Sequence, residues 1–333
     1  MAAQRGVAGT VGTAVPATDQ RVAVRTHRRP GKRRATSWRT RAELTLLLGP
    51  ALVLFVGFVL TPIAVAVYYS LYHWSGFGPL SDFAGIDNYK TALADPVFHK
   101  AILHNIIIAL LSLFIQLPLS IGIALLLNRK LWGRGFLRLV VFAPYVLSEA
   151  VTAVIWLLML QPGGFADQVL RAVGLEGLIR PWLADQHLVL YTLFVVITWK
   201  YIGFGIVLLL AGLQGIPDEL REAAALDGAT PWQVTRRVTI PLLGPTIRIW
   251  IFLSMIGSLQ LFDLVWIMTT GGPANASTTM AVYMIDHGFR RYEFGYGSAV
   301  AVILFIICFV FALVYQRFAL RRDVEGALTR AVG

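Results

Sequence analysis

Long apolar runs that carry almost no charge constrain the fold of this chain more than any other feature. Six such runs occur, at residues 44–72, 102–127, 137–160, 188–213, 247–269 and 298–316. About 20 consecutive apolar residues form a helix that crosses the hydrocarbon core of a bilayer, and longer runs cross it with some tilt. We therefore predict six membrane spans.

The composition agrees with a membrane protein and excludes an ordinary soluble one. Hydrophobic residues make up 57% of the 333-residue chain and charged residues only 14%, whereas a soluble domain has about 25% charged residues. Transmembrane strands would show alternating segments of about 10 residues, but these runs are continuous and rich in Leu, Ile, Val and Ala. The expected fold class is an all-α membrane protein with six transmembrane helices.

The distribution of basic residues predicts the orientation in the membrane. With the amino terminus in the cytoplasm, the two tails and the second and fourth loops hold 22 of the 29 Lys and Arg residues, the opposite side holds six, and Lys200 lies within a span. Cytoplasmic loops are enriched in Lys and Arg, so both termini are expected to be cytoplasmic. The excess of basic residues behind the net charge of +11 then lies on the cytoplasmic side of the membrane, so it gives no reason to expect nucleic-acid binding.

Both ends of the chain are expected to lie outside a membrane domain at residues 43–322. Residues 1–42 are of low complexity with a basic run, and predict a disordered cytoplasmic tail that attracts anionic membrane lipid. Residues 323–333 form a short cytoplasmic carboxyl-terminal tail. The one cysteine, Cys308, excludes an intrachain disulfide and a thiolate metal cluster, and its apolar neighbours favour a packing role.

Sequence motifs for catalysis or for cofactor binding are absent. None of the lysines stands in the Gly-x-x-x-x-Gly-Lys-Ser/Thr loop that cradles phosphate groups, so any nucleotide hydrolysis belongs to a partner. The six histidines never occur four residues apart, as a helical zinc protease site requires, and no Gly-x-Ser-x-Gly nucleophile motif is found. We expect neither an enzyme nor a metal or cofactor site.

The loop between the fourth and fifth runs predicts two short helices joined by a turn. Pro217 suits a first helical position, and the two acidic residues that follow it suit the positive end of a helix dipole. Gly228 suits a left-handed stop. Thr230 can then cap a second helix that starts at Pro231, and Pro241 is expected to limit that helix before the fifth span.

The order of residues in this loop resembles the EAA loop of permease subunits of binding-protein-dependent ABC importers. The matching segments read Glu222-Ala223-Ala224, Asp227-Gly228-Ala229 and Val238-x-Ile240-Pro241. That family usually has Ile where Val238 stands and Leu where Ile240 stands, so both departures are mild. The resemblance implies a coupling loop at residues 214–245 that docks on a cytoplasmic ATPase through Glu222, Ala223, Ala224, Asp227, Gly228, Ile240 and Pro241.

Other segments are similar to the carbohydrate branch of that family, the maltose and glycerol-phosphate type. They are Phe83-x-Gly85-x-Asp87-Asn88-Tyr89, Trp199-Lys200 with Gly203, Gly271-Gly272-Pro273, and Phe294-Gly295-Tyr296-Gly297-Ser298-Ala299. The resemblance covers residues 43–322 and implies a type I importer permease fold in the bacterial inner membrane. It also implies a second permease subunit in a heterodimer, a cytoplasmic ABC ATPase dimer, an extracytoplasmic sugar-binding protein and a di- or oligosaccharide as substrate.

Polar and aromatic side chains inside the spans are the candidates for a sugar pathway, because polar groups are costly in a bilayer unless they face the bundle interior or a wet cavity. They are Ser254, Ser258, Gln260 and Asp263 in the fifth run, Tyr145, Glu149 and Trp156 in the third, and Trp199, Lys200 and Tyr201 in the fourth. In related permeases the sugar site draws mainly on the span after the coupling loop. Each of these side chains could instead make a hydrogen bond between helices.

Two alternatives to an importer subunit remain open from the residues alone. The first is an ion-coupled secondary transporter that uses Glu149, Lys200 and Asp263 as a relay, and the second is an anchoring membrane protein without transport. We also expect Glu149 and Lys200 to pair, directly or through water, because they lie at matching depths in adjacent antiparallel spans and lone charges there are costly.

Overall fold

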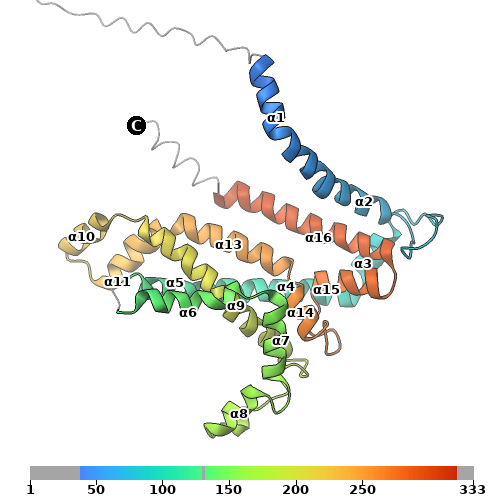
Figure 1. The fold of residues 1–333 in the computed structure, drawn as a ribbon. Coiled ribbons are helices and arrows are strands. Elements are labelled where there is room, and N and C mark those ends of the chain that lie inside the picture. Colours follow the sequence, from blue (N-terminus) through green and yellow to red (C-terminus); the bar gives the residue numbers. More distant parts are fainter. Residues whose placement is uncertain (1–37, 130–131, 321–333) are drawn as a thin grey trace, which may run out of the picture. The chain divides into compact units, whose positions relative to one another are not determined.

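The computed structural model describes residues 38–129 and 132–320 (Figure 1). Within these ranges the regular structure is helical, and the β-structure consists of an isolated antiparallel bridge between Tyr72 and Phe83. The chain forms two units, residues 1–55 and 56–333. The predicted tails, 1–42 and 323–333, lie outside the described ranges except for residues 38–42.

The first unit contributes one described helix, α1 (Trp38–Phe55), which contains Pro50. The described helices of the second unit are, in chain order, η1 (Val56–Leu60), α2 (Thr61–Tyr69), α3 (Asp87–Ala94), α4 (Pro96–Leu111), η2 (Ser112–Gln116), α5 (Leu117–Leu127), α6 (Arg134–Val146), α7 (Glu149–Leu160), α8 (Phe165–Ala172), η3 (Glu176–Leu178), α9 (Val189–Gln214), α10 (Asp218–Leu226), α11 (Pro231–Val234), η4 (Thr235–Thr239), α12 (Ile240–Leu242), α13 (Gly244–Leu259), α14 (Asp263–Met268), α15 (Met280–Ile285), η5 (Asp286–Arg290), α16 (Phe294–Tyr315) and η6 (Gln316–Leu320). Those named η are π-helices, except the 3-10 helix η3.

Four continuous helical stretches of the described chain are long and apolar enough to cross a membrane. They are Thr45–Tyr69, Pro96–Leu127, Val189–Gln214 and Phe294–Ala319, and they overlap the first, second, fourth and sixth predicted runs. Two further stretches pass only as bent pairs, Arg134–Val146 with Glu149–Leu160 at 96° and Pro231–Leu242 with Gly244–Leu259 at 64°. The 96° bend lies within the third predicted run, whereas the 64° bend precedes the fifth, which is interrupted instead at residues 260–262 between α13 and α14. Neither run is one continuous helix, and the total of six spans stays a prediction.

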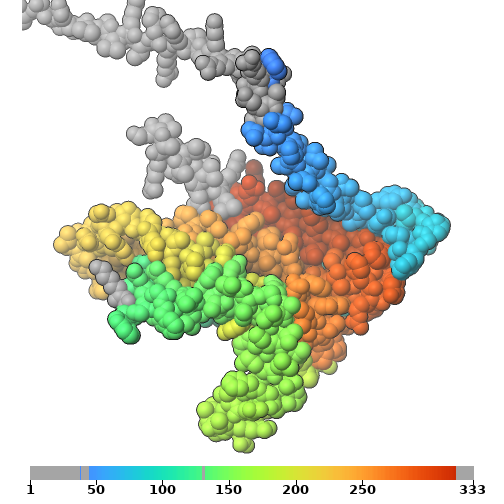
Figure 2. Space-filling model, in the orientation of Figure 1, coloured from blue at the N-terminus to red at the C-terminus, as the bar shows by residue number. Residues whose placement is uncertain are grey.

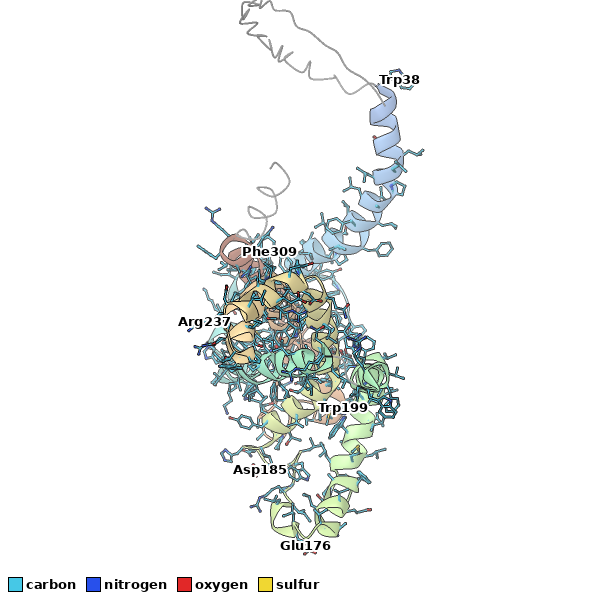
Figure 3. The ribbon with its side chains drawn as sticks, turned by 90° about the vertical axis from the view of Figure 1, so that its left-hand side faces the viewer. Trp38, Glu176, Asp185, Trp199, Arg237 and Phe309 are labelled. Atoms are coloured by element: carbon cyan, nitrogen blue, oxygen red, sulfur yellow. The ribbon has the colours of Figure 1, made fainter. Side chains whose placement is uncertain are left out.

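The break in the third run follows from local signals that its apolar pattern hides. Pro144 lies in the last turn of α6, where its missing N–H removes the hydrogen bond to the Val140 carbonyl group and weakens that turn. Leu147 and Ser148 are extended, and the Ser148 hydroxyl accepts a hydrogen bond from the Val151 N–H at 3.2 Å as the N-cap of α7. A new helix therefore begins at Glu149 in another direction, and α7 leads away from the bundle toward Glu176 (Figures 1 and 3).

Three prolines inside the other helical stretches follow π-helical turns. The π-helices η1, η2 and η4 each end two residues before a proline, namely Pro62, Pro118 and Pro241. A π-turn widens the helix, which leaves room for the proline ring and for the carbonyl group that loses its N–H partner. Pro241 was predicted to limit the second loop helix. The helix continues through η4 into α12 and ends at Leu242, one residue after Pro241, where a bend of 64° separates it from α13.

Helix α9 is the central packing element of the second unit. It contacts α5, α6 and α13, and its apolar residues enter two of the buried clusters. Gly203 lies against the backbone of Val141 in α6, and Gly205 lies against the indole of Trp250 in α13, so closely that a Cβ at either position would overlap its neighbour. These close approaches bring α6 and α13 against α9, where all three line the cavity described below.

Candidate functional site

The loop segment α10–α12 lies at one end of the second unit, opposite α3 and α15 (Figures 1 and 2). Pro217 is the N-cap residue of α10 rather than its first helical residue, and Gly228 has a φ of +82° just after the helix ends. Thr230 caps α11 in a capping box with Gln233, and Pro231 is the first helical residue as predicted. The two short helices joined by a left-handed turn are therefore present.

This segment is exposed along most of its length. Helix α10 has no buried residue among its nine, and Glu222, Asp227 and Gly228 are all exposed. The most exposed large apolar side chains of the segment are Leu226 at 89% and Trp232 at 68%. Neither residue was among the predicted site residues, although exposed apolar side chains in an otherwise polar loop are the usual signal of a contact surface.

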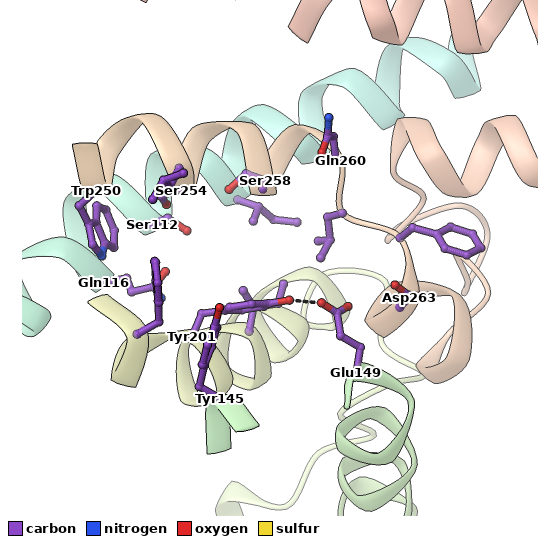
Figure 4. A pocket seen from close by; sticks show the side chains of 17 residues that line it. Ser112, Gln116, Tyr145, Glu149, Tyr201, Trp250, Ser254, Ser258, Gln260 and Asp263 are labelled. Atoms are coloured by element: carbon purple, nitrogen blue, oxygen red, sulfur yellow. Dashed lines mark hydrogen bonds between the residues drawn. The ribbon is translucent and has the colours of Figure 1, made fainter. Parts of the chain in front are cut away.

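A cavity of about 410 Å³ lies at the other end of α13, between this helix and α6, α7 and α9 (Figure 4). Its lining comprises Ile108, Ser112, Gln116, Tyr145, Glu149, Ile197, Tyr201, Phe204, Trp250, Leu253, Ser254, Gly257, Ser258, Gln260, Leu261, Phe262 and Asp263. The volume lies within the range of about 300–1,000 Å³ that small-molecule sites occupy.

The break between α6 and α7 and the break between α13 and α14 both open onto this cavity. Glu149 is the first residue of α7, and its carboxylate accepts a hydrogen bond from the Tyr201 hydroxyl of α9. Asp263 is the first residue of α14, directly after the break in the fifth run. The aromatic part of the wall includes Tyr145, whose ring stacks on Phe204 with centroids 5.1 Å apart. The cavity thus combines carboxylates, hydroxyls and amides with aromatic faces.

Residues 116–324 match the family described as binding-protein-dependent transport system inner membrane component. The chain belongs to this family. It is 31% identical to the diacetylchitobiose uptake system permease protein NgcF of Streptomyces coelicolor, over 85% of this chain and 84% of that protein. It is 34% identical to the multiple sugar-binding transport system permease protein MsmF of Streptococcus mutans, over 79% and 90%.

The fold is also similar to a solved structure, a bacterial alginate ABC transporter in complex with alginate pentasaccharide-bound periplasmic protein. The TM-score is 0.74 at 22% identity, with 86% of this chain and 98% of that chain covered. The resemblance to importer permeases is therefore confirmed in family and in fold. The protein is a multi-pass component of the inner membrane, its family works with a binding protein and a separate ATPase, and it is not an enzyme. The ion-coupled alternative gains no support.

The structure places seven of the ten predicted pathway residues of the permease in the cavity wall, namely Ser254, Ser258, Gln260, Asp263, Tyr145, Glu149 and Tyr201. Trp156, Trp199 and Lys200 lie outside it. The rings of Trp156 and Trp199 pack edge to face with centroids 5.5 Å apart, and Trp156 contacts a buried apolar cluster. These two tryptophans therefore pack helices α7 and α9 together.

Lys200 is buried and does not pair with Glu149. Its Nζ donates a hydrogen bond to the Leu147 carbonyl oxygen at 2.5 Å. Among the described residues there is no direct ion pair between Lys200 and Glu149, so the direct form of the predicted pair is wrong, whereas a pair through water stays a prediction. The physical reason is the break in the third run, which frees the Leu147 carbonyl group at the end of α6 and offers it to the ammonium group.

Several polar and aromatic residues of the cavity wall were not predicted from the sequence. Ser112 and Gln116 are buried, four residues apart in η2, and Trp250 is buried in α13. The signal that selected the other candidates, a polar side chain inside a predicted span, was present at Ser112 and Gln116 as well. Phe204 and Phe262 carried no such signal, because an apolar ring in a membrane span looks like ordinary packing.

Proposed function

We propose that this permease forms one half of a heterodimeric pathway through which a di- or oligosaccharide crosses the membrane, delivered by an extracytoplasmic sugar-binding protein. The observation that carries the proposal is the cavity, whose wall joins aromatic rings to carboxylate, amide and hydroxyl groups. The names of related permeases add support, because NgcF is named for diacetylchitobiose uptake and MsmF for multiple sugars.

Each kind of wall residue has a role in this proposal. Sugar hydroxyls lose hydration water inside the membrane and need donors and acceptors that replace it. Glu149 and Asp263 supply acceptors, Gln260 supplies both donors and acceptors, and Ser254 supplies a hydroxyl. Tyr145 and Trp250 supply apolar ring faces that can lie against the C–H face of a sugar ring. No covalent chemistry is required of the permease.

The energy for transport comes from a cytoplasmic ABC ATPase dimer that binds the α10–α12 segment. Supporting this role are the exposed side chains of Leu226 and Trp232, the fixed turn at Gly228 and the resemblance to the EAA loop. The small side chains of Ala223 and Ala224 allow a partner surface to approach α10 closely. We expect movement of the ATPase to reach the cavity through α13, which follows the segment directly.

The proposal is tested by purifying the tagged permease in mild detergent together with its partners. We expect a second permease, an ATPase and a binding protein to be recovered, and the binding protein to bind members of a panel of di- and oligosaccharides. In proteoliposomes the complex should take up the bound sugar only with ATP. Uptake that continues without the ATPase and collapses with a protonophore would overturn the proposal in favour of a secondary transporter.

A further inference from the structure

Residues 260–262, which separate α13 from α14 in the fifth run, include no proline or glycine. A side chain from α4 makes hydrogen bonds to the backbone beside this break. Asn105 is fully buried. Its Nδ2 donates hydrogen bonds to the carbonyl oxygens of Ser258 at 2.6 Å and Leu259 at 3.3 Å, and its Oδ1 accepts one from the Met280 N–H at 2.9 Å. One carboxamide therefore joins the end of α13 to the beginning of α15.

These backbone groups need partners because they lie at helix ends inside an apolar bundle. The last carbonyl groups and the first N–H groups of a helix have no partner within it, and an unpaired polar group is costly in a membrane. A carboxamide supplies two donors and an acceptor from one position. Thr279 completes the arrangement, since its hydroxyl donates to the Leu261 carbonyl oxygen at 2.7 Å.

The segment that Asn105 holds is part of the cavity wall. Gln260, Leu261 and Phe262 form the break, Asp263 follows them, and all four line the cavity. Helix α13 runs from this break to the bend beside α12 in the coupling segment. It therefore connects the proposed ATPase contact at one end with the cavity at the other, and Asn105 fixes its cavity end to α4 and α15.

We propose that Asn105 is a positioning residue that ties the cavity end of α13 in place, so that movement of the coupling segment changes the cavity wall. Without these hydrogen bonds α13 moves, but residues 260–262 in the cavity wall do not move with it. ATP hydrolysis then continues while less sugar crosses for each ATP consumed. This inference rests on the proposed sugar transport and adds the residue that transmits movement to the site.

The test compares Asn105→Leu with Asn88→Leu in the complete complex in proteoliposomes. Asn88 is a matched control, because it is also buried and donates from Nδ2 to two carbonyl oxygens, those of Ser70 at 2.8 Å and Tyr72 at 3.0 Å, outside the cavity. The quantity measured is sugar taken up per ATP hydrolysed, normalised to assembled complex. Asn105→Gln, which keeps the carboxamide on a longer stem, serves as the conservative variant.

We expect the ratio to fall at least about fivefold in Asn105→Leu, in line with one or more unsatisfied backbone groups, to recover in part in Asn105→Gln, and to stay at the wild-type value in Asn88→Leu. If Asn105→Leu does not assemble, Thr279→Val removes the neighbouring bond with little change in volume and should lower the same ratio. An equal effect in both asparagine variants, or a normal ratio in Asn105→Leu or in Thr279→Val, would overturn the inference. Failure of the proposed function is distinct, because the wild-type complex would then take up no sugar.

Discussion

Lys200 illustrates at the scale of a residue how a helix end can supply the direct partner of a buried charge. Its ammonium group binds the Leu147 carbonyl oxygen at the C-terminus of α6, where the helix dipole favours a cation. Lys200→Met should therefore lower the free energy of unfolding by about 1–3 kcal/mol, and Lys200→Gln, which keeps a donor, by less. Thermal unfolding of the purified complex checks this.

A double variant at Lys200 and Glu149 distinguishes the observed contact with Leu147 from the direct ion pair predicted from the sequence. Because Lys200 does not pair directly with Glu149, adding Glu149→Gln to Lys200→Met should not restore stability. Recovery of the unfolding temperature in the double variant would contradict the contact described here and favour a direct charge pair.

Asp95 has a comparable role at the beginning of α4. Its carboxylate accepts hydrogen bonds from the Val97 N–H and from the Tyr283 hydroxyl, each at 2.6 Å. Burial raises the pKa of this carboxyl group, but the bonds from Tyr283, Val97 and Phe98 lower it more, so the pKa lies below its usual value. The stabilisation is therefore complete above the usual carboxyl pKa and is lost as the pH falls through the lowered one.

We expect Asp95→Ala to reduce stability at neutral pH by about 0.5–2 kcal/mol, as the loss of an N-cap does. Tyr283→Phe should weaken the same site less, because the N-cap bond to Val97 remains. Unfolding temperatures measured from neutral to acidic pH should show the difference between wild type and Asp95→Ala shrinking at the acidic end. A difference that grows toward low pH would contradict this assignment.

The coupling segment gives the sharpest prediction at the scale of an element. Gly228 has a φ of +82°, which a β-branched side chain strongly disfavours, so Gly228→Val should change the angle between α10 and α11. Ala224→Trp should leave the turn intact and hold the ATPase away by its bulk. In both variants we expect normal membrane insertion and reduced ATPase co-purification, while Arg330→Ala should have little effect. Full ATPase association and uptake in both would contradict the role of the segment.

At the same scale, the elements show what sequence reasoning could and could not predict. The loop helices followed from Gly228, Thr230 and Pro231, because caps and turns depend on neighbouring residues. The break in the third run was predictable in principle from Pro144 and Ser148. It was not predicted, because the run is apolar on both sides of these residues and resembles one continuous span. The break in the fifth run was not predictable, because the groups that satisfy it come from residues as distant as Asn105.

The candidate site shows the same division. Polarity within an apolar run found Glu149, Gln260 and Asp263, which line the cavity. It could not tell them from Lys200, which lies just as deep in its span but faces a helix end. Side-chain direction after a broken helix depends on tertiary packing, which no single run of sequence contains.

At the scale of the whole molecule, the predicted orientation in the membrane remains to be tested. Asp87 in α3 and Arg237 in η4 lie in segments at opposite ends of the second unit, and both are exposed (Figure 1). In a background with Cys308→Ala, a cysteine at position 87 should react with an impermeant thiol reagent from outside intact cells. A cysteine at position 237 should react only after the membrane is opened. Labelling of both from one side would contradict six spans with cytoplasmic termini.

The most direct test of the account asks whether sugar occupies the cavity during transport. In the same cysteine-free background, Ser254→Cys places a thiol in the cavity wall, and Ile249→Cys places one on an exposed position of the same helix outside it. We predict that binding protein, sugar and ATP together slow labelling of position 254 by a thiol reagent and leave position 249 unchanged. Equal labelling of position 254 with and without sugar, in a complex that is transporting it, would contradict the claim that this cavity carries the sugar.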